Sequence, residues 1–329
     1  MNRRLVFALL VVLLGFCVAH YRWAISQSLT ETEVVFEVHS GDSLARVASR
    51  LSEIGLLDNT HWFKVSAMWR GAATRLKAGE YVISPGVTVP ALLELLVSGA
   101  VRQHSLLLVE GWNYRQVMNA VCSHPVIVKT VCGRSEFAVA EVFGSIEQHP
   151  EGRFFPDTYH LTRGTPDIDF LKRAVVRMDR VLQSEWDVRS ENLPFEMPYE
   201  ALILASIIEK ETGRTSERRE ISGVFVRRLQ KRMLLQADPT VIYGMGEHYK
   251  GNIRSRDLVE DTPYNTYIHP GLPPTPIAIP GRASIHAALH PKEGSTLFFV
   301  AKGDGSHYFS SSRREHNRAV NRYQRKRKH

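Results

Sequence analysis

The longest apolar run of the chain lies near its N-terminus, where residues 5–19 carry no charge. Arg3 and Arg4 precede the run, and Tyr21 and Trp23 follow it closely. The run is shorter than the roughly 20 residues of a membrane-spanning helix and overlaps the length of a signal-peptide core. Small residues at cleavage-site spacing are poorly placed, whereas the flanking aromatic residues are typical of a membrane interface. We therefore favour an uncleaved anchor over a cleaved signal peptide, because local thinning of the bilayer or flanking side chains can accommodate a short span.

Beyond this run, the apolar positions alternate between strand and helix periods, which predicts a small α+β unit. The predicted elements are strands at 34–38 and 79–83 and helices that begin near Leu44, near Asn59 or Thr60, and after Thr88. A turn at Gly41, with Asp42 or Ser43 as the helix cap, separates the first strand from its helix.

From about residue 105 onward the pattern predicts a larger, mixed α+β domain. Its predicted helices span residues 113–121, 136–143, 170–186 and 199–211, followed by a helix capped by Ser216 and a basic C-terminal helix. Closing strands are predicted at 297–301 and 307–309. Two segments are predicted to be irregular: residues 236–246, a polar loop followed by a buried turn, and residues 264–281, which contain five prolines. Such a long loop within a compact domain is usually functional.

The helix after Ser216 is amphipathic. Its predicted buried stripe consists of Ile221, Val224, Phe225 and Leu229, and its predicted solvated face consists of Arg227, Arg228, Lys231 and Arg232. Basic residues opposite an apolar stripe are by default exposed to solvent.

Composition and charge narrow the choice of function. With 329 residues, of which 43% are hydrophobic and 23% charged, the chain is long enough for two domains and has an ordinary globular composition. Its formal charge of +8 lies mainly in the C-terminal tail, where residues 313–328 include eight basic residues and one acidic residue. Because no zinc-finger spacing or RNA-recognition motif accompanies this charge, we expect no nucleic-acid partner.

Three cysteines are present, and Cys17 lies within the apolar run. Cys122 and Cys132 are ten positions apart and could form a disulfide if the segment is exported to an oxidising compartment. The cysteines show no metal-binding spacing, so we expect no metal and no cofactor.

The most distinctive polar residues end the helix predicted at 199–211. Glu209, Lys210 and Glu211 directly follow an apolar run at residues 202–208. A carboxyl group set against apolar side chains is poorly solvated, so its pKa rises and it can hold a proton near neutral pH. A general acid needs that state. The alternative is that both glutamates are solvated residues of the last helical turn, because charge runs usually lie at the surface.

The sequence V-x-S-G-D-S-L-x-x-V-A at residues 38–48 resembles the opening of the LysM module. That module is associated with polymers that contain N-acetylglucosamine, such as peptidoglycan. The alternative is a capped turn from strand to helix, which any small α+β unit could use. The helix through Trp62 and Phe63 also makes the unit longer than a minimal module.

Several ordered motifs of the larger domain closely resemble the MltG (YceG-like) endolytic murein transglycosylases. They are A-S-I-I-E-K-E-T at 205–212, V-F-x-x-R-L at 224–229, L-Q-A-D-P-T-V-I-Y-G-M-G at 235–246 and Y-N-T-Y-x-x-x-G-L-P-P at 264–274. Shorter matches are K-A-G-E-Y at 77–81, V-E-G at 109–111 and F-x-P-D-T at 154–158.

The resemblance implies a single-pass enzyme of the inner membrane. Its expected parts are a cytoplasmic stub and transmembrane anchor at 1–24, a LysM-like α+β subdomain at 25–104, and a periplasmic YceG-like catalytic domain with a basic tail at 105–329. The expected partners are peptidoglycan glycan strands and peptidoglycan synthases.

The family pattern places the catalytic acid on the second glutamate of E-K-E, here Glu211, with Glu209 as the nearby alternative. About 200° separate these two positions around a helix, so they face one cleft only if the helix ends between them. Other motif positions imply substrate-binding residues along a groove: Gln236, Asp238, Tyr243, Tyr264, Asn265 and Thr266. The alternative for each is a side chain that bonds the backbone of its own loop.

The reaction implied is cleavage of the bond between N-acetylmuramic acid and N-acetylglucosamine within nascent strands. It leaves 1,6-anhydro ends, which would terminate strand elongation. One carboxylic acid can suffice because the muramyl C6 hydroxyl attacks, whereas hydrolases generally need two carboxylates. Two other functions stay open: a noncatalytic wall-binding anchor with a structural Glu211, and a pyridoxal-phosphate lyase that uses Lys210. The absence of a phosphate-cradling glycine loop from the sequence disfavours the lyase.

Overall fold

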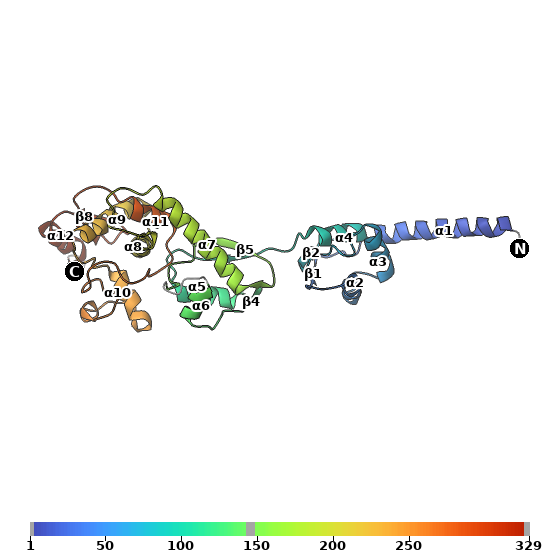
Figure 1. The fold of residues 1–329 in the computed structure, drawn as a ribbon, viewed down its shortest axis with the longest axis horizontal. Coiled ribbons are helices and arrows are strands. Elements are labelled where there is room, and N and C mark those ends of the chain that lie inside the picture. Colours follow the sequence, from blue (N-terminus) through green and yellow to red (C-terminus); the bar gives the residue numbers. More distant parts are fainter. Residues whose placement is uncertain (1–2, 143–148, 326–329) are drawn as a thin grey trace. The chain divides into compact units, whose positions relative to one another are not determined.

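The computed structural model describes residues 3–142 and 149–325, whose elements are drawn in Figure 1. The chain forms two compact units, Met1–His104 with His160–Thr165 and Ser105–Tyr159 with Pro166–His329. Both units combine helices with short strands, which confirms the predicted α+β class. The finer predicted boundary between an anchor and a LysM-like subdomain stays a prediction.

The first unit is a small layer of helices on a two-stranded sheet. Its elements are α1 (Arg3–Ser26), β1 (Val34–Val38), α2 (Leu44–Glu53), α3 (Thr60–Trp69), β2 (Gly79–Ile83) and α4 (Val89–Ser98). β1 and β2 pair antiparallel, with Phe36 opposite Tyr81, and both of these side chains are buried in the core. Ser43 caps α2 by accepting the Arg46 N–H at 3.3 Å, so Ser43 is the cap that the sequence left undecided.

Helix α1 is longer than the uncharged run in the sequence suggests. Its stretch Val6–Ser26 has 21 residues and a mean hydropathy of 1.9, and it is long and apolar enough to cross a membrane. At 1.5 Å per residue such a stretch covers about 30 Å, the thickness of a bilayer core. The predicted thinning of the bilayer is therefore unnecessary. Near the end of α1, the Tyr21 ring packs against Trp62 and Trp69 of α3.

The other described residues form more helices and three further two-stranded sheets. The helices are α5 (Tyr114–Ser123), α6 (Glu136–Val142), α7 (Asp167–Trp186), α8 (Pro198–Glu211), α9 (Thr215–Gln230), α10 (Asp238–Met245), α11 (Arg282–Leu289) and α12 (Arg313–Val320). The strands are β3 (His104–Leu107), β4 (Ile127–Val128), β5 (Thr158–Leu161), β6 (Thr165–Pro166), β7 (Phe298–Ala301) and β8 (His307–Ser310). β3 pairs with β5, β4 with β6, and β7 with β8.

Helix α8 is the central helix of the second unit. Every residue from Ala201 to Ile208 is buried, and the helix packs against α7, α9, α10 and α11 (Figure 1). A helix that is apolar on all sides is stable only when it is buried on all sides. The helix ends at Glu211 because Thr212 adopts an extended backbone, with φ −148° and ψ 135°. The fold therefore brings the E-K-E residues to the point where the apolar core ends.

Two predictions of local structure were wrong. Residues 236–246 contain the helix α10 instead of a loop, because Pro239 lies in the first turn, where its missing N–H is not needed. The helix predicted to be capped by Ser216 begins at Thr215, and Arg214 takes the N-cap position without a side-chain bond. Residues 264–281, all of them described, form no helix or strand, as predicted. Residue 143, the predicted end of α6, lies outside the described residues.

The predicted solvated face of α9 was also wrong in part. Arg228 is only 7% exposed, and it donates to the carbonyl oxygens of Leu235 at 2.7 Å and Leu297 at 2.8 Å. The neighbouring Arg227 donates to the Thr296 carbonyl at 2.7 Å. Chain segments on either side cover this face of the helix, and their carbonyl groups satisfy the guanidinium groups that water would otherwise bind.

The structure confirms a disulfide between Cys122 and Cys132, whose Cα atoms lie 5.8 Å apart. The buried Asp167 carboxylate holds the same loop, because it accepts the N–H groups of Val131 and Cys132 at 2.9 Å each. Asp167 begins α7, where a carboxylate also interacts favourably with the helix dipole.

Candidate active site

Three consecutive side chains at the end of α8 have three different surroundings. Glu209 pairs with Arg218 in the interior, and the Lys210 ammonium donates to the Gly111 carbonyl at 3.1 Å. Glu211 lines an open groove. Successive helix positions are rotated by about 100°, so the second glutamate lies roughly opposite the first. As the spacing of Glu209 and Glu211 predicted, the two acids do not face the same cleft.

The groove that contains Glu211 has a volume of about 410 Å³. Its polar lining includes Glu211, Arg228, Gln236, Asp238, Tyr267, His307 and His316. Apolar side chains from β7, led by Phe299, form another wall. The groove therefore brings together three of the residues predicted from the sequence, Glu211, Gln236 and Asp238, on surfaces suited to a ligand rich in hydroxyl groups.

The carboxyl group of Glu211 holds its proton unusually tightly. Burial, and second the negative charge of Asp238, raise the pKa of Glu211 from its ordinary value of 4.5 to about 8. Burial is the larger influence, as the sequence predicted. The cation that lowers this pKa is Arg228, whereas the nearby Lys210 and Arg214 donate to backbone carbonyl groups elsewhere. At neutral pH the group is mostly in the protonated form that a general acid requires.

Asp238 stands at the start of α10 and is anchored by a tyrosine. The Tyr267 hydroxyl donates to Oδ1 of Asp238 at 2.5 Å. Burial, together with the hydrogen bond to Asp238, raises the pKa of Tyr267, so the hydroxyl stays protonated and remains a donor. The first turn of a helix favours negative charge. The groove thus presents a protonated carboxyl group and an anchored carboxylate to the same ligand.

Glu209 is tied into the fold by both of its oxygens. Oε1 accepts from Arg218 at 3.1 Å, and Oε2 accepts the Gly281 N–H at 2.9 Å. The side chains of Glu209 and Arg218 are 6% and 9% exposed. A Cβ atom at Gly281 would lie 1.9 Å from Oε1 of Glu110, so no larger residue fits there without a shift. Glu209 therefore joins α8 to α9 and to the loop before α11.

Tyr243, predicted to lie in the same groove as Glu211, lines a second groove of about 570 Å³. Its hydroxyl donates to Oε2 of Glu151 at 2.9 Å. Burial raises the pKa of Glu151 to about 7. Lys210 also lines this second groove. The end of α8 and the helix α10 therefore contribute side chains to both grooves.

Tyr264, Asn265 and Thr266, the residues of the Y-N-T motif, contact the residues and backbone next to the two grooves. Tyr264 packs on Tyr243 with ring centroids 4.7 Å apart. Asn265 is buried and donates to the Glu260 carbonyl at 2.8 Å. Thr266 is also buried, and its hydroxyl accepts the Ala237 N–H at 3.0 Å. Asn265 and Thr266 therefore bond backbone groups of the loops, which was the alternative to the predicted substrate-binding role.

Four groove residues were not predicted to lie in the groove, and Arg228 was predicted to be solvated. Arg228 and Tyr267 occupy motif positions, the arginine of V-F-x-x-R-L and the last tyrosine of Y-N-T-Y, so the motifs held a usable signal for them. His307 and His316 come from β8 and α12, and nothing in their local sequence points to the groove. His307 is held by Glu217, whose Oε2 lies 2.8 Å from Nδ1 of the ring.

Comparison with known proteins gives concordant matches over most of the chain. The model of the YceG-like family matches residues 36–322. An endolytic murein transglycosylase of Bacillus subtilis is 31% identical over an alignment of 311 positions that covers 89% of this chain and 86% of that protein. One of Streptococcus pneumoniae is 26% identical and covers 87% of this chain, but the match spans 58% of that protein. The crystal structure of a YceG-like protein of Listeria monocytogenes, 28% identical, superposes with a TM-score of 0.54 over 88% of this chain and 100% of that one.

Proposed function

Because this chain belongs to the YceG-like family, we propose that it is an endolytic murein transglycosylase whose catalytic acid and base is Glu211. The relatives from Bacillus subtilis and Streptococcus pneumoniae carry that enzyme name. The observation that carries the choice of residue is the position of the Glu211 carboxyl group in a polar groove, where burial raises its pKa to about 8. Glu209 is unsuited to the role because both of its oxygens already accept hydrogen bonds from the protein.

In the first step the protonated Glu211 gives its proton to the oxygen that links N-acetylmuramic acid to N-acetylglucosamine. The bond from C1 to that oxygen breaks, and the leaving sugar departs with a hydroxyl group. Positive charge develops at C1 of the muramyl residue, as in other glycosidic cleavages. The carboxylate of Asp238, fixed by Tyr267, is positioned to stabilise that charge without having to reorganise.

In the second step the ionised Glu211 takes the proton of the muramyl C6 hydroxyl. The O6 atom forms a bond to C1, which closes the 1,6-anhydro ring and returns Glu211 to its protonated form. No water is consumed. A pKa of about 8 suits a group that must first donate and then accept a proton near neutral pH.

The remaining predicted residues have supporting roles in this proposal. Gln236 lines the groove and donates hydrogen bonds to the glycan, while Asn265 and Thr266 hold the backbone beneath it. Tyr243 lines the second groove, where a continuing strand would be held, and Tyr264 packs against the Tyr243 ring. Glycan binding by residues 25–104, the LysM-like unit, stays a separate prediction.

We further propose that the enzyme lies in the inner membrane, with α1 as a single span and the chain after α1 in the periplasm. Support comes from the length and composition of Val6–Ser26 and from Arg3 and Arg4, which favour a cytoplasmic N-terminus. The disulfide between Cys122 and Cys132 fits an oxidising compartment. An enzyme anchored in this membrane would meet nascent strands where peptidoglycan synthases release them. Those synthases are therefore its expected partners. Cleavage at that place would end the elongation of a strand.

The test is to incubate the full-length protein in detergent micelles with uncross-linked glycan strands and to analyse the new ends by mass spectrometry. We expect 1,6-anhydro ends from the unmutated protein and from Glu220→Gln, a control on the surface of α9 where Glu220 pairs with Lys292. Glu211→Gln should release almost none.

Other products would support other functions. Reducing ends in place of anhydro ends would identify a hydrolase, and unchanged strands would identify a noncatalytic wall-binding anchor. Lys210→Met should keep the anhydro product, because the Lys210 ammonium contacts the Gly111 carbonyl instead of the groove of Glu211. Loss of activity in that variant alone would favour chemistry on Lys210.

A further inference from the structure

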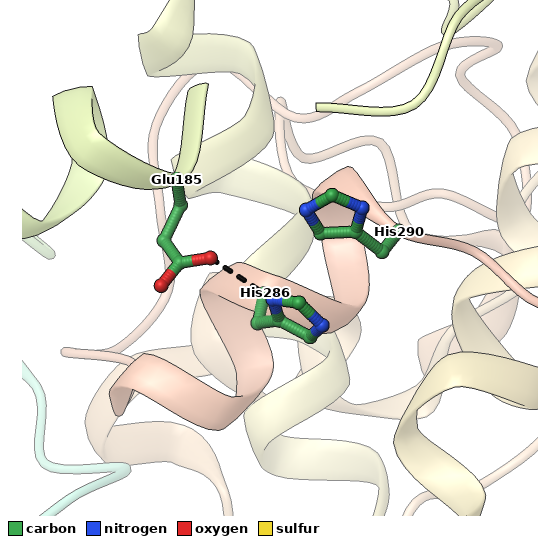
Figure 2. A group of neighbouring side chains, drawn as sticks. All are labelled: Glu185, His286 and His290. Carbon is green, nitrogen blue, oxygen red and sulfur yellow. Dashed lines mark hydrogen bonds and ion pairs between the residues drawn. The ribbon is translucent and has the colours of Figure 1, made fainter. Parts of the chain in front are cut away.

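A separate cluster of ligand-type side chains lies between α7 and α11, outside the linings of both grooves (Figure 2). Glu185 comes from the last turn of α7, His286 lies on α11, and His290 is the residue directly after the end of α11. One carboxylate oxygen and one nitrogen of each imidazole lie within 4.8 Å of one another. Two histidines four positions apart at a helix end bring their rings to the same side, and this spacing is common in metal sites.

The three side chains are already oriented toward one another. Oε2 of Glu185 lies 2.9 Å from Nδ1 of His286, the contact drawn in Figure 2. The two imidazole rings are stacked, with centroids 4.2 Å apart. Nε2 of His290 is buried and, among the residues that the structure describes, has no hydrogen-bond partner. A buried polar atom without a partner is costly, and a bound ligand would satisfy it.

Outer contacts hold the cluster in place as they do around known metal ligands. Nε of Arg282 donates to Oε1 of Glu185 at 3.1 Å, which leaves Oε2 on the side of the imidazoles. Nδ1 of His290 lies 3.4 Å from the Ser190 hydroxyl, which leaves Nε2 as its free nitrogen. Metal-binding carboxylates and imidazoles are typically fixed by such hydrogen bonds from a second layer of residues.

We propose that Glu185, His286 and His290 bind one divalent transition-metal ion of the zinc class. Two imidazoles and a carboxylate are borderline ligands that suit Zn²⁺, Co²⁺ or Ni²⁺ better than Mg²⁺ or Ca²⁺. Tetrahedral zinc with bonds of about 2.0–2.1 Å needs ligand atoms roughly 3.4 Å apart. The ligand atoms of the cluster lie within 4.8 Å of one another, so side-chain rotations must bring them closer together when the ion binds. The ion then replaces the proton between Glu185 and His286, and water completes its coordination.

Such an ion would stabilise the fold and take no part in glycan cleavage. It would link α7 to α11, and both helices pack against α8, which carries Glu211 at its end. Because no residue of the cluster lines the groove of Glu211, we expect transglycosylase activity per folded molecule to be independent of the ion. The metal site can therefore be tested independently of the proposed reaction.

The experiment uses full-length protein in detergent micelles, with any affinity tag removed because tags bind metals. Chelator-treated protein is dialysed against micromolar Zn²⁺, and bound zinc is counted by mass spectrometry; Co²⁺ serves as a visible-light probe of the ligands. His286→Ala is the main variant, since His286 is exposed and its loss should leave the fold intact. His269→Ala is the matched control, because His269 also pairs with a carboxylate, Asp261 at 2.7 Å, but has no second histidine.

We expect one zinc ion per chain in the unmutated protein and in the control. His286→Ala should weaken binding by more than the roughly 10–100-fold that losing an outer contact costs. Zinc should raise the midpoint of thermal unfolding of the unmutated protein and the control, but not of His286→Ala. Zinc binding that is equally tight in His286→Ala, or no retained zinc in the unmutated protein, would overturn the assignment.

Discussion

Replacing Glu211 with glutamine should abolish catalysis while it stabilises the fold. Glutamine keeps the size of the side chain but has no titrating proton, so it cannot protonate the glycosidic oxygen. Loss of a general acid costs about 10²–10⁴ in rate, and the upper end applies here because the same group also acts as the base. A residue that served only the structure would show the opposite pattern, with lower stability and much of the activity retained.

The gain in stability follows from the raised pKa of Glu211. In the unfolded chain this carboxyl group titrates at its ordinary pKa of 4.5, and in the folded chain at about 8. A folded-state pKa above the unfolded one means that stability is fully present below pH 4.5 and is lost as the pH rises toward 8. At about 1.4 kcal/mol per pKa unit, the loss reaches up to about 3 kcal/mol at pH 7 and about 5 kcal/mol at pH 9. Solvent that reaches the carboxyl group through the groove reduces both values.

The measurement is denaturant unfolding of the full-length protein in detergent at pH 4 and pH 9. Glu211→Gln should match the unmutated protein at pH 4 and be several kcal/mol more stable at pH 9, because glutamine never has to be buried as a charge. A difference that stays constant between the two pH values would refute the raised pKa and, with it, the physical basis for choosing Glu211.

Glu209→Gln, two residues away, is the matched control for these measurements. It leaves the buried Arg218 guanidinium without its carboxylate partner. Removing one partner of a buried ion pair typically costs about 3–5 kcal/mol, so this variant should be less stable at neutral pH. The folded fraction should nevertheless retain clearly more activity than Glu211→Gln. If the two variants exchanged these behaviours, the catalytic role would belong to Glu209.

Three further predictions concern the support of the site and its location. Tyr267→Phe removes the hydroxyl that donates to Asp238. This change should lower kcat by about 10- to 100-fold, which corresponds to a hydrogen bond to a charged group, while leaving the midpoint of unfolding nearly unchanged. The rate at which anhydro ends are released measures kcat. Cys132→Ser opens a short loop and should lower the free energy of unfolding by about 2–3 kcal/mol with activity retained, as judged by parallel denaturant and activity assays. A reporter fused after His329 should be periplasmic, and N-terminal sequencing of the membrane-bound protein should find an intact start; an N-terminus near residue 20 would contradict the anchor.

The end of α8 could be predicted from the sequence because its determinants are local. An apolar run followed by E-K-E identifies a buried helix that ends at the core boundary, and the apolar context predicts the raised pKa of Glu211. The angular separation of Glu209 and Glu211 depends only on helix geometry, so it also held. The two strands of the first unit, at 34–38 and 79–83, were predicted from local composition and alternation, whereas their antiparallel pairing was not predicted.

The features that the sequence did not predict depend on distant partners. The carbonyl of Leu297, which holds Arg228 in the interior, is 69 positions away along the chain. From the sequence alone, a basic residue opposite the apolar stripe of a helix is predicted to be solvated, because the segment that covers it is distant in the chain. Likewise His286 and His290 are visible as a pair, but Glu185 is 101 positions from His286 and only the packing of α7 on α11 brings it near.

The charge of Asp238 connects the stability of the site to its chemistry. Beside the buried Glu211, this negative charge disfavours a second ionised carboxyl group, so it helps to keep the catalytic proton in place and makes the folded state less stable at high pH. When the glycosidic bond breaks, positive charge appears in the same groove, and the same carboxylate then becomes favourable. Once Glu211 has given up its proton, the repulsion from Asp238 strengthens its tendency to take a proton back from the C6 hydroxyl. In the proposed mechanism, this anchored charge favours the protonated form of Glu211 before the reaction, the cation during it, and recovery of the proton at its end, so a single acid would serve both steps.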